Sequence, residues 1–170
     1  MKNLMILLFA SISFVSCESI SGNGNVTDEK RPLSNINTVE TSGSIDVEIN
    51  TGDNYSLTVQ DEQNLIPYVV TEINGGELNI HYKDGYSIMN DHAKVIVTVP
   101  TLDKIITSGS GDITSDGVIK SYNEIEMHTS GSGDIKATVN APSVKVTGSC
   151  SGDIELSGMT KDFDCSISGS

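Results

Sequence analysis

The sequence predicts an all-β fold of the β-solenoid type, in which repeats of about 20 residues stack on one another. A short motif recurs in the second half of the chain, as SGSGDI at residues 108–113 and 130–135 and as SCSGDI at residues 149–154. The aspartates of consecutive motifs are 22 and then 19 positions apart, which suits coils of about 19–22 residues. Glycines permit the tight corners of such coils, and apolar and polar residues alternate after each motif, as they do along β-strands.

Residues 1–16 have the features of an export signal. Lys2 supplies a positive charge, residues 4–9 form a short apolar run, and a small residue precedes Cys17. The segment resembles a bacterial lipobox, in which the cysteine becomes the lipidated first residue of the mature protein, so we predict that Cys17 carries a lipid anchor. The alternative is an ordinary signal peptide that leaves Cys17 free. Glu18 follows the cysteine, where an Asp would mark inner-membrane retention. This favours the outer membrane or the cell surface, with the periplasmic face as another placement.

Residues 17–33 are rich in Ser, Gly, Asn and charged side chains, which predicts a flexible tether between the lipid and a folded domain at residues 34–170. The full chain has a formal net charge of −13, and removal of residues 1–16 takes away one Lys and no acid, which leaves −14. This negative charge repels nucleic acid, so we expect no nucleic-acid partner. We expect the protein to contact the membrane only through its lipid anchor.

In the first half of the domain, the sequence predicts less regular strands. The apolar and polar alternation and the Gly, Asn and Pro breaks define their limits. Asn74-Gly75-Gly76 is typical of a hairpin turn, and Pro100 ends a strand. Strands are expected within residues 37–50, on both sides of a corner at residues 42–44, and at residues 55–59, 68–70, 78–82 and 94–99.

In the second half, alignment of the repeats on their aspartates places apolar residues in columns. The intervening residues, such as Glu126 and Lys145, are polar and are expected to face solvent. The columns therefore predict a core built from stacked side chains. They contain Ile113, Ile135 and Ile154 one position after the aspartate; Ile105, Met127, Val146 and Cys165 seven before it; and Ile125, Val144 and Phe163 nine before it.

Motifs distributed along the chain resemble those of the head GIN domain family of auto-transporter adhesins. They include SGSIDV at residues 42–47, NLIP at 64–67, GGELNI at 75–80, VTVP at 97–100 and the repeated SGSGDI motif. The similarity extends from about Gly22 to the end of the chain. It implies a single-stranded, right-handed parallel β-helix, an exported lipoprotein and a role in adhesion, and the family has no established catalytic residues. Cys150 departs from the pattern, because the repeat normally has Gly or Ser there.

The sequence contains no arrangement typical of a catalytic site. Arg31 falls in the expected tether, and no G-x-S-x-G nucleophile motif is present. His81, His92 and His128 have neither metal-ligand nor catalytic-triad spacing. We therefore predict that the protein is not an enzyme. The alternative to this prediction is a carbohydrate-active enzyme on a β-helix, which would need clustered carboxylates.

The motif aspartates Asp112, Asp134 and Asp153 are weak candidates for a metal site. Gly-rich repeats that end in Asp resemble the calcium-binding nonapeptide rolls, but those need two motifs in each coil, whereas one occurs here. We expect the three side chains to cap solvent-facing corners and expect no cofactor, with calcium as the alternative. An exported chain also permits a Cys150–Cys165 disulfide. The register favours two free thiols, because it places Cys165 in an inward column and Cys150 in a corner.

Together these features predict a lipid-anchored adhesion module of the cell envelope whose ligand is an extracellular glycan or protein. The main alternative is a structural envelope protein that assembles with copies of itself into a homo-oligomer. Residues 168–170 begin a further SGSGDI motif and the sequence ends within it. We therefore expect either a longer natural chain or a second copy that covers the last coil.

Overall fold

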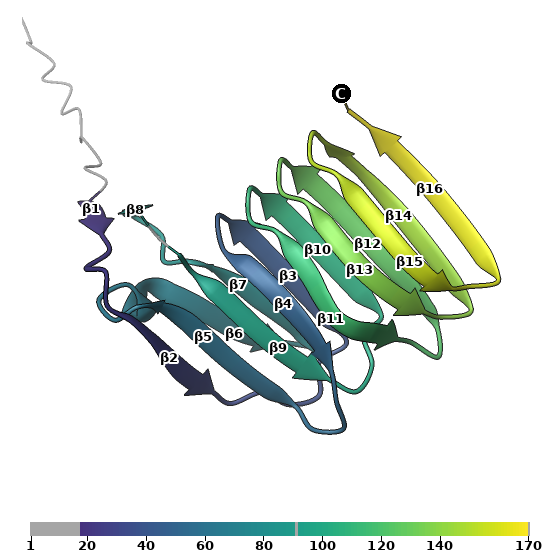
Figure 1. The fold of residues 1–170 in the computed structure, drawn as a ribbon, viewed down its shortest axis with the longest axis horizontal. Helices are drawn as coiled ribbons and strands as arrows, with labels where there is room; N and C mark the ends of the chain where they lie inside the picture. Colours follow the sequence, from purple (N-terminus) through teal and green to yellow (C-terminus); the bar gives the residue numbers. More distant parts are fainter. Residues whose placement is uncertain (1–17, 91, 170) are drawn as a thin grey trace, which may run out of the picture.

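The computed structural model describes residues 18–90 and 92–169, and in these ranges the chain forms sixteen β-strands and one short 3-10 turn (Figure 1). The strands form two seven-stranded sheets and one two-stranded ribbon. The prediction of an all-β fold is confirmed. Among the described residues, no helix has the length and apolar character needed to span a bilayer. The signal segment and Cys17 lie outside the described residues.

The first sheet contains, in spatial order, β16 (Asp162–Ser168), β14 (Ser143–Cys150), β12 (Glu124–Gly131), β10 (Lys104–Gly109), β3 (Thr38–Gly43), β7 (Glu77–Tyr82) and β6 (Val69–Asn74). The second contains β15 (Ile154–Met159), β13 (Ile135–Asn140), β11 (Ile113–Lys120), β4 (Asp46–Thr51), β9 (Lys94–Val99), β5 (Ser56–Glu62) and β2 (Val26–Arg31). The ribbon pairs β1 (Glu18–Ser21) with β8 (Tyr86–Met89), and the 3-10 turn spans Ile66–Tyr68. Strands β2, β5 and β6 lie at one end of the molecule and β15 and β16 at the other (Figure 1).

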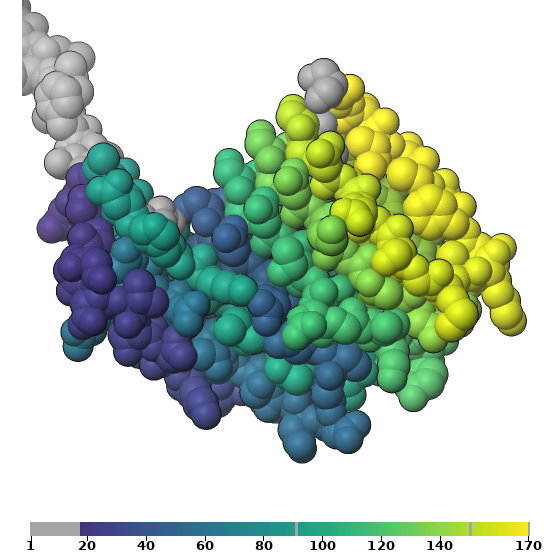
Figure 2. Space-filling model, viewed as in Figure 1, coloured from purple at the N-terminus to yellow at the C-terminus, as the bar shows by residue number. Residues whose placement is uncertain are grey.

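The repeats in the second half alternate between the two sheets and pair in parallel. Strands β10, β12, β14 and β16 are neighbours in the first sheet, and β11, β13 and β15 are neighbours in the second. Figure 2 shows the face of the second sheet, on which the colours follow one another in bands because consecutive repeats lie side by side. The predicted columns are confirmed as register partners: Ile113 pairs with Ile135 and Ile135 with Ile154, while Met127 pairs with both Ile105 and Val146.

The core lies between the two sheets and consists of the inward side chains of these columns. Ile105, Ile113 and Ile125 are fully buried, and Met127 and Ile135 are at most 1% exposed. Burial of an aliphatic side chain of this size stabilises the fold by about 1.5–3 kcal/mol relative to an exposed position. The stacked aliphatic residues therefore hold the repeats together.

The prediction that every column is buried is wrong for the last repeat. Phe163 is 58% exposed, Cys165 is exposed and Ile154 is only half-buried. The physical reason is that β15 and β16 are edge strands of their sheets. Each has a neighbouring strand on one side only among the described residues.

The prediction of a single parallel solenoid over all of residues 34–170 is wrong for the first half of the domain. Here β5 pairs antiparallel with both β2 and β9, and β6 pairs antiparallel with β7, so both sheets are mixed. Gly75 and Gly76, with φ of 60° and 89°, form the predicted turn between β6 and β7. The coil made of β3 and β4 lies between this antiparallel region and the regular repeats.

The prediction of a flexible tether is wrong for the strands that lie within residues 18–33. The β2 strand pairs with β5, and β1 pairs with β8. Arg31 explains why β2 is held in place, because its guanidinium reaches the edge strand of the other sheet. It donates to the Val69 carbonyl at 2.6 Å, to Thr71 Oγ1 at 3.0 Å and to the Ile66 carbonyl at 3.1 Å. The only arginine of the chain thus links the two sheets at this end.

Candidate functional site

The outward face of the first sheet carries a regular polar surface, which we call the serine face. Its central column consists of one serine from each repeat motif and from the matching corner of β3. In register these are Ser42, Ser108, Ser130 and Ser149. Adjacent rungs are about 4.8 Å apart, the spacing of hydrogen-bonded strands. The sequence repeat thus becomes a row of hydroxyl groups, of which Ser130 and Ser149 are exposed.

Beside the serine column lies a hydrogen-bonded network centred on His128. One ring nitrogen of His128 lies 3.2 Å from Glu126 Oε2 and the other 2.6 Å from Thr147 Oγ1. The Lys104 ammonium is 3.6 Å from the same Glu126 oxygen. The hydrogen bond with His128, followed by the charge of Lys104, holds the pKa of Glu126 below its usual value.

The network and the serine column border a shallow groove on the serine face. Its volume is about 260 Å³, and Ile106 adds an apolar side chain between the hydroxyl groups. This arrangement can form many weak hydrogen bonds with a ligand that lies across several strands. The lining residues are Ile106, Thr107, Ser108, His128, Thr129, Ser130, Thr147, Gly148 and Ser149.

The three motif aspartates form a ladder on the corners. Asp112 accepts a hydrogen bond from the backbone N–H of Asp134, and Asp134 accepts one from Asp153, at 2.9 and 2.8 Å. At the start of the ladder, Asp46 accepts from the N–H of Asp112 at 2.9 Å. The structure therefore gives the carboxylates of Asp46, Asp112 and Asp134 a role in joining coils, whereas Asp153 takes part through its backbone N–H. Within residues 18–90 and 92–169, no group of three or more His, Cys, Asp or Glu side chains is arranged to hold a metal ion.

The motif glycines allow the coils to approach each other closely at the same corner. A Cβ on Gly111 would lie 2.2 Å from the Ile45 carbonyl oxygen, and one on Gly133 would lie 2.1 Å from the Gly111 carbonyl oxygen. Real Cβ atoms do not make contacts this short, so backbone packing requires glycine here. Two residues thus explain the SGSGDI motif. Its second glycine lets consecutive coils approach closely, and its aspartate forms a hydrogen bond between them.

The histidines singled out in the sequence lie in separate environments. His81 is on β7, where its ring nitrogen is 2.8 Å from the Tyr82 carbonyl oxygen, and His92 lies 3.0 Å from Glu62 Oε1. His128 belongs to the serine face. Cys165 is a free, exposed thiol on β16, and the side chain of Cys150 is not among those described.

Asp61 and Glu62 form a buried acidic pair that sequence reasoning missed. Asp61 is fully buried and Glu62 is 3% exposed. Burial, followed by the hydrogen bond between the two carboxyl groups, raises the pKa of Asp61 to about 6. A signal was present, because Asp61 continues the inward alternation of Leu57 and Val59 on β5 and is the first charged residue in that row.

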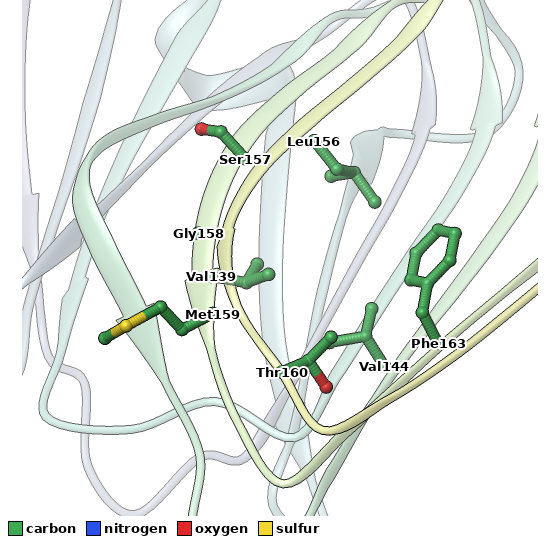
Figure 3. Close-up of a pocket in the computed structure, with 8 residues that line it drawn as sticks. All are labelled: Val139, Val144, Leu156, Ser157, Gly158, Met159, Thr160 and Phe163. Atoms are coloured by element: carbon green, nitrogen blue, oxygen red, sulfur yellow. The ribbon is translucent and has the colours of Figure 1, made fainter.

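A second, apolar groove lies between β15 and the turn into β16. It has a volume of about 290 Å³. Figure 3 shows Val139, Leu156 and Phe163 directed into one space, whereas the Met159 side chain points away from it. Val144, Ser157, Gly158 and Thr160 complete the lining.

Comparisons with known proteins agree with the sequence resemblance. A family model described as "Putative auto-transporter adhesin, head GIN domain" matches residues 35–170. No curated protein matches the chain.

Three solved structures show a similar fold. A "putative lipid binding protein" from Parabacteroides distasonis is 26% identical with a TM-score of 0.75, over 88% of this chain and 65% of that one. A putative adhesin from the same organism is 22% identical with a TM-score of 0.64, over 88% and 73% of the two chains. A putative adhesin from Bacteroides fragilis is 12% identical with a TM-score of 0.63, over 88% and 96%. The chain thus spans less than two thirds of the first of these proteins.

Proposed function

Because the chain belongs to the head GIN domain family, we propose that it is a non-catalytic adhesion module of the cell envelope. The observation that supports this role is the serine face, where hydroxyl groups of Ser108, Ser130 and Ser149 repeat at strand spacing beside the His128 network. Solved structures with the same fold are also named as adhesins. The protein acts by binding, and its site is a surface rather than an enclosed pocket.

In the repeat region behind this surface, formed by β3, β4 and β10 to β16, the architecture is a right-handed parallel β-helix. The parallel register of β10, β12 and β14 in one sheet and of β11, β13 and β15 in the other supports it, because a coil that returns to the same sheet produces this pairing. Each coil adds one rung to the serine face. The number of rungs therefore sets the length of ligand that the face can contact.

The ligand is an extracellular glycan or a protein segment with many hydrogen-bonding groups. Hydroxyl rows satisfy such partners through several weak bonds, and the shallow groove around Ile106 accepts a small apolar group. The formal net charge of −13 disfavours polyanionic ligands. Neutral or cationic polymers fit the face best.

The protein is held at the membrane by a lipid on Cys17 and faces outward from the outer membrane or the cell surface. The lipobox-like segment supports this placement. A short ribbon would then connect the lipid to the domain. The proposal needs no calcium, because the carboxylates of Asp112 and Asp134 each accept a backbone N–H of the next coil.

A second candidate function is self-association as a structural envelope protein. The exposed apolar side chains of Met159, Phe163 and Ile167 on β15 and β16 favour it, because edge strands with apolar residues pair with other strands. The relative named as a lipid binding protein suggests a different occupant for the adjacent groove, an acyl chain. Sedimentation velocity across a concentration series and binding of a fluorescent fatty acid separate these two uses.

The experiment that tests the proposed function is a glycan-array and envelope pull-down study combined with turnover assays on retained polysaccharides. We expect retention of one or more envelope components without release of shorter products. Release of unsaturated or reducing sugars would identify a carbohydrate-active enzyme instead. Failure to retain any envelope component would contradict the adhesion role.

A further inference from the structure

The acidic pair Asp61–Glu62 lies where the two-stranded ribbon meets the body of the protein. The carboxyl group of Glu62 is directly beside Gly22, which follows β1: a Cβ on Gly22 would lie 2.8 Å from Glu62 Cδ and Oε1. On its other side, Glu62 Oε1 is 3.0 Å from Nδ1 of His92, which follows β8. The side chain of Glu62 therefore contacts the segments that continue from both strands of the ribbon.

Hydrogen bonds fix Asp61 next to Glu62. Asp61 Oδ1 accepts from the Glu62 backbone N–H at 2.8 Å, and the backbone N–H of His92 donates to the same carboxyl group. The Tyr82 hydroxyl on β7 lies 3.4 Å from Asp61 Oδ2. Asp61 is thus surrounded by groups from β5, β7 and the segment after β8, and it is fully buried.

One oxygen of the pair has no donor when both groups are ionised. Glu62 Oε2 is buried and has no hydrogen-bond partner among the described residues. The side chains of Asp61 and Glu62 are in hydrogen-bonding contact, so a proton on Asp61 would be donated to the Glu62 carboxylate. Without that proton, two negative charges would be buried in contact, which is costly.

We propose that Asp61 and Glu62 form a proton-operated latch that holds the β1–β8 ribbon on the body of the protein. The latch is closed when the two carboxyl groups share one proton and loosens when both are ionised. The ribbon begins next to Cys17 in the sequence, so, given the lipid anchor proposed above, the latch sets how firmly the domain is held near that anchor. The latch itself does not depend on the proposed adhesion role.

The direction of the pH effect follows from the two groups. The pKa of Asp61 is raised from 3.8 to about 6, mainly by burial, so its contribution to latch stability is complete below about pH 4 and is lost as the pH rises through about 6. The pKa of Glu62 is lowered, mainly by the hydrogen bond with Asp61, so its contribution is lost only when the pH falls below 4.5. The latch is therefore most stable at about pH 4–4.5 and loses stability from there up to about pH 6.

Among the described residues of β5, β7 and the segments after β1 and β8, the titratable groups that contact the pair are His92 and Tyr82. A protonated His92 would form an ion pair with Glu62 and would also strengthen the latch at low pH. The experiment must therefore distinguish Asp61 from His92 as the titrating group.

Amide hydrogen exchange on the full chain tests the latch between pH 4.5 and 7.5, after correction for intrinsic exchange rates. We expect protection of Glu18–Ser21 and Tyr86–Met89 to fall by up to about tenfold per pH unit as far as pH 6, and to level off above pH 7. Protection in β12 should not follow this curve. Asp61→Asn keeps the size of the side chain and the oxygen that accepts from the Glu62 N–H, and it should make ribbon protection independent of pH.

Two further variants separate the causes. Asp28→Asn removes an exposed carboxylate on β2 and should leave the pH curve of the ribbon unchanged. His92→Gln should retain most of the curve. A flat curve in the wild type, a curve that survives Asp61→Asn, or its loss in His92→Gln would each overturn the latch. If Asp61→Asn does not fold, a side-chain carboxyl ¹³C NMR titration of the wild type decides: a step near pH 6 supports the latch, and two ordinary titrations contradict it.

Discussion

The carboxylate of Asp112 accepts a hydrogen bond from the backbone N–H of Asp134, one coil further along the chain, at a distance of 2.9 Å. The bond lies at a solvent-exposed corner, where water replaces part of a lost interaction. We expect Asp112→Ala to lower the free energy of unfolding by about 0.5–1 kcal/mol, because it leaves the Asp134 N–H without its acceptor. Asp112→Asn keeps an acceptor oxygen and should cost less than half as much.

Chemical denaturation of the purified variants measures this difference. Asp53→Ala is the matched control, since Asp53 is also exposed in a turn but lies outside the ladder. Equal losses in Asp112→Ala and Asp53→Ala would show that the ladder bond does not stabilise the corner.

Substitution of a stacked isoleucine should lower the free energy of unfolding far more than substitution of its outward-facing neighbour. Ile135 is 1% exposed and pairs in register with Ile113 and Ile154. Ile135→Ala should cost about 2–5 kcal/mol, and Ile135→Asp should unfold most of the domain because it buries an unpaired charge. Lys136→Gln removes only an exposed ion pair with Glu155 and should change stability by less than about 0.5 kcal/mol. Similar melting temperatures for Ile135→Ala and Lys136→Gln would reject the register.

Arg31 should contribute more to the stability of the protein than the other charged side chains of β2, which are exposed. Its side chain is 17% exposed and donates to the Val69 carbonyl and the Thr71 hydroxyl of β6 in the opposite sheet, and to the Ile66 carbonyl in the 3-10 turn before β6. Arg31→Ala should cost about 2 kcal/mol, and Arg31→Lys should restore only part of this, since one ammonium cannot reach all three acceptors. Lys30→Ala, on the same strand and exposed, is the control. Equal denaturation midpoints for Arg31→Ala and Lys30→Ala would contradict the link between the sheets.

The lipid anchor proposed at Cys17 leads to a prediction that can be tested in cells. Cys17→Ser should yield a protein that no longer incorporates labelled fatty acid and no longer partitions into the detergent phase. Cys165→Ser removes a free thiol from the folded domain and should leave partitioning unchanged. Fatty-acid labelling that persists in Cys17→Ser would show that the anchor lies elsewhere.

The regular half of the fold could be predicted from sequence because its register follows from the motif. Each aspartate marks the same corner, so Ile113 and Ile135 had to be partners once the coils were stacked. The antiparallel strands of the first half could not be predicted in the same way. Alternation along β5 or β9 shows which side chains are buried, but it is identical for parallel and antiparallel neighbours.

The β2 strand was missed for a different reason. All its residues but Arg31 are exposed, so no apolar alternation marks it as a strand, and its charges resemble those of a linker. The latch pair was missed because alternation indicates that Asp61 points inward but says nothing of the groups that meet it there. Tyr82 and His92 reach Asp61 only through the pairing of distant strands.

The adhesion role is tested most directly by the affinity of the protein for its retained envelope ligand before and after alteration of the serine face. The double variant Ser130→Glu with Ser149→Glu places two charges in the exposed serine column and should weaken binding at least about tenfold. Thr114→Glu adds a charge to an exposed position on β11, in the other sheet, and should bind like the wild type. All variants must have wild-type melting temperatures for the comparison. Unchanged affinity in the double variant, or an equal loss in Thr114→Glu, would contradict the assignment of the serine face as the adhesive surface.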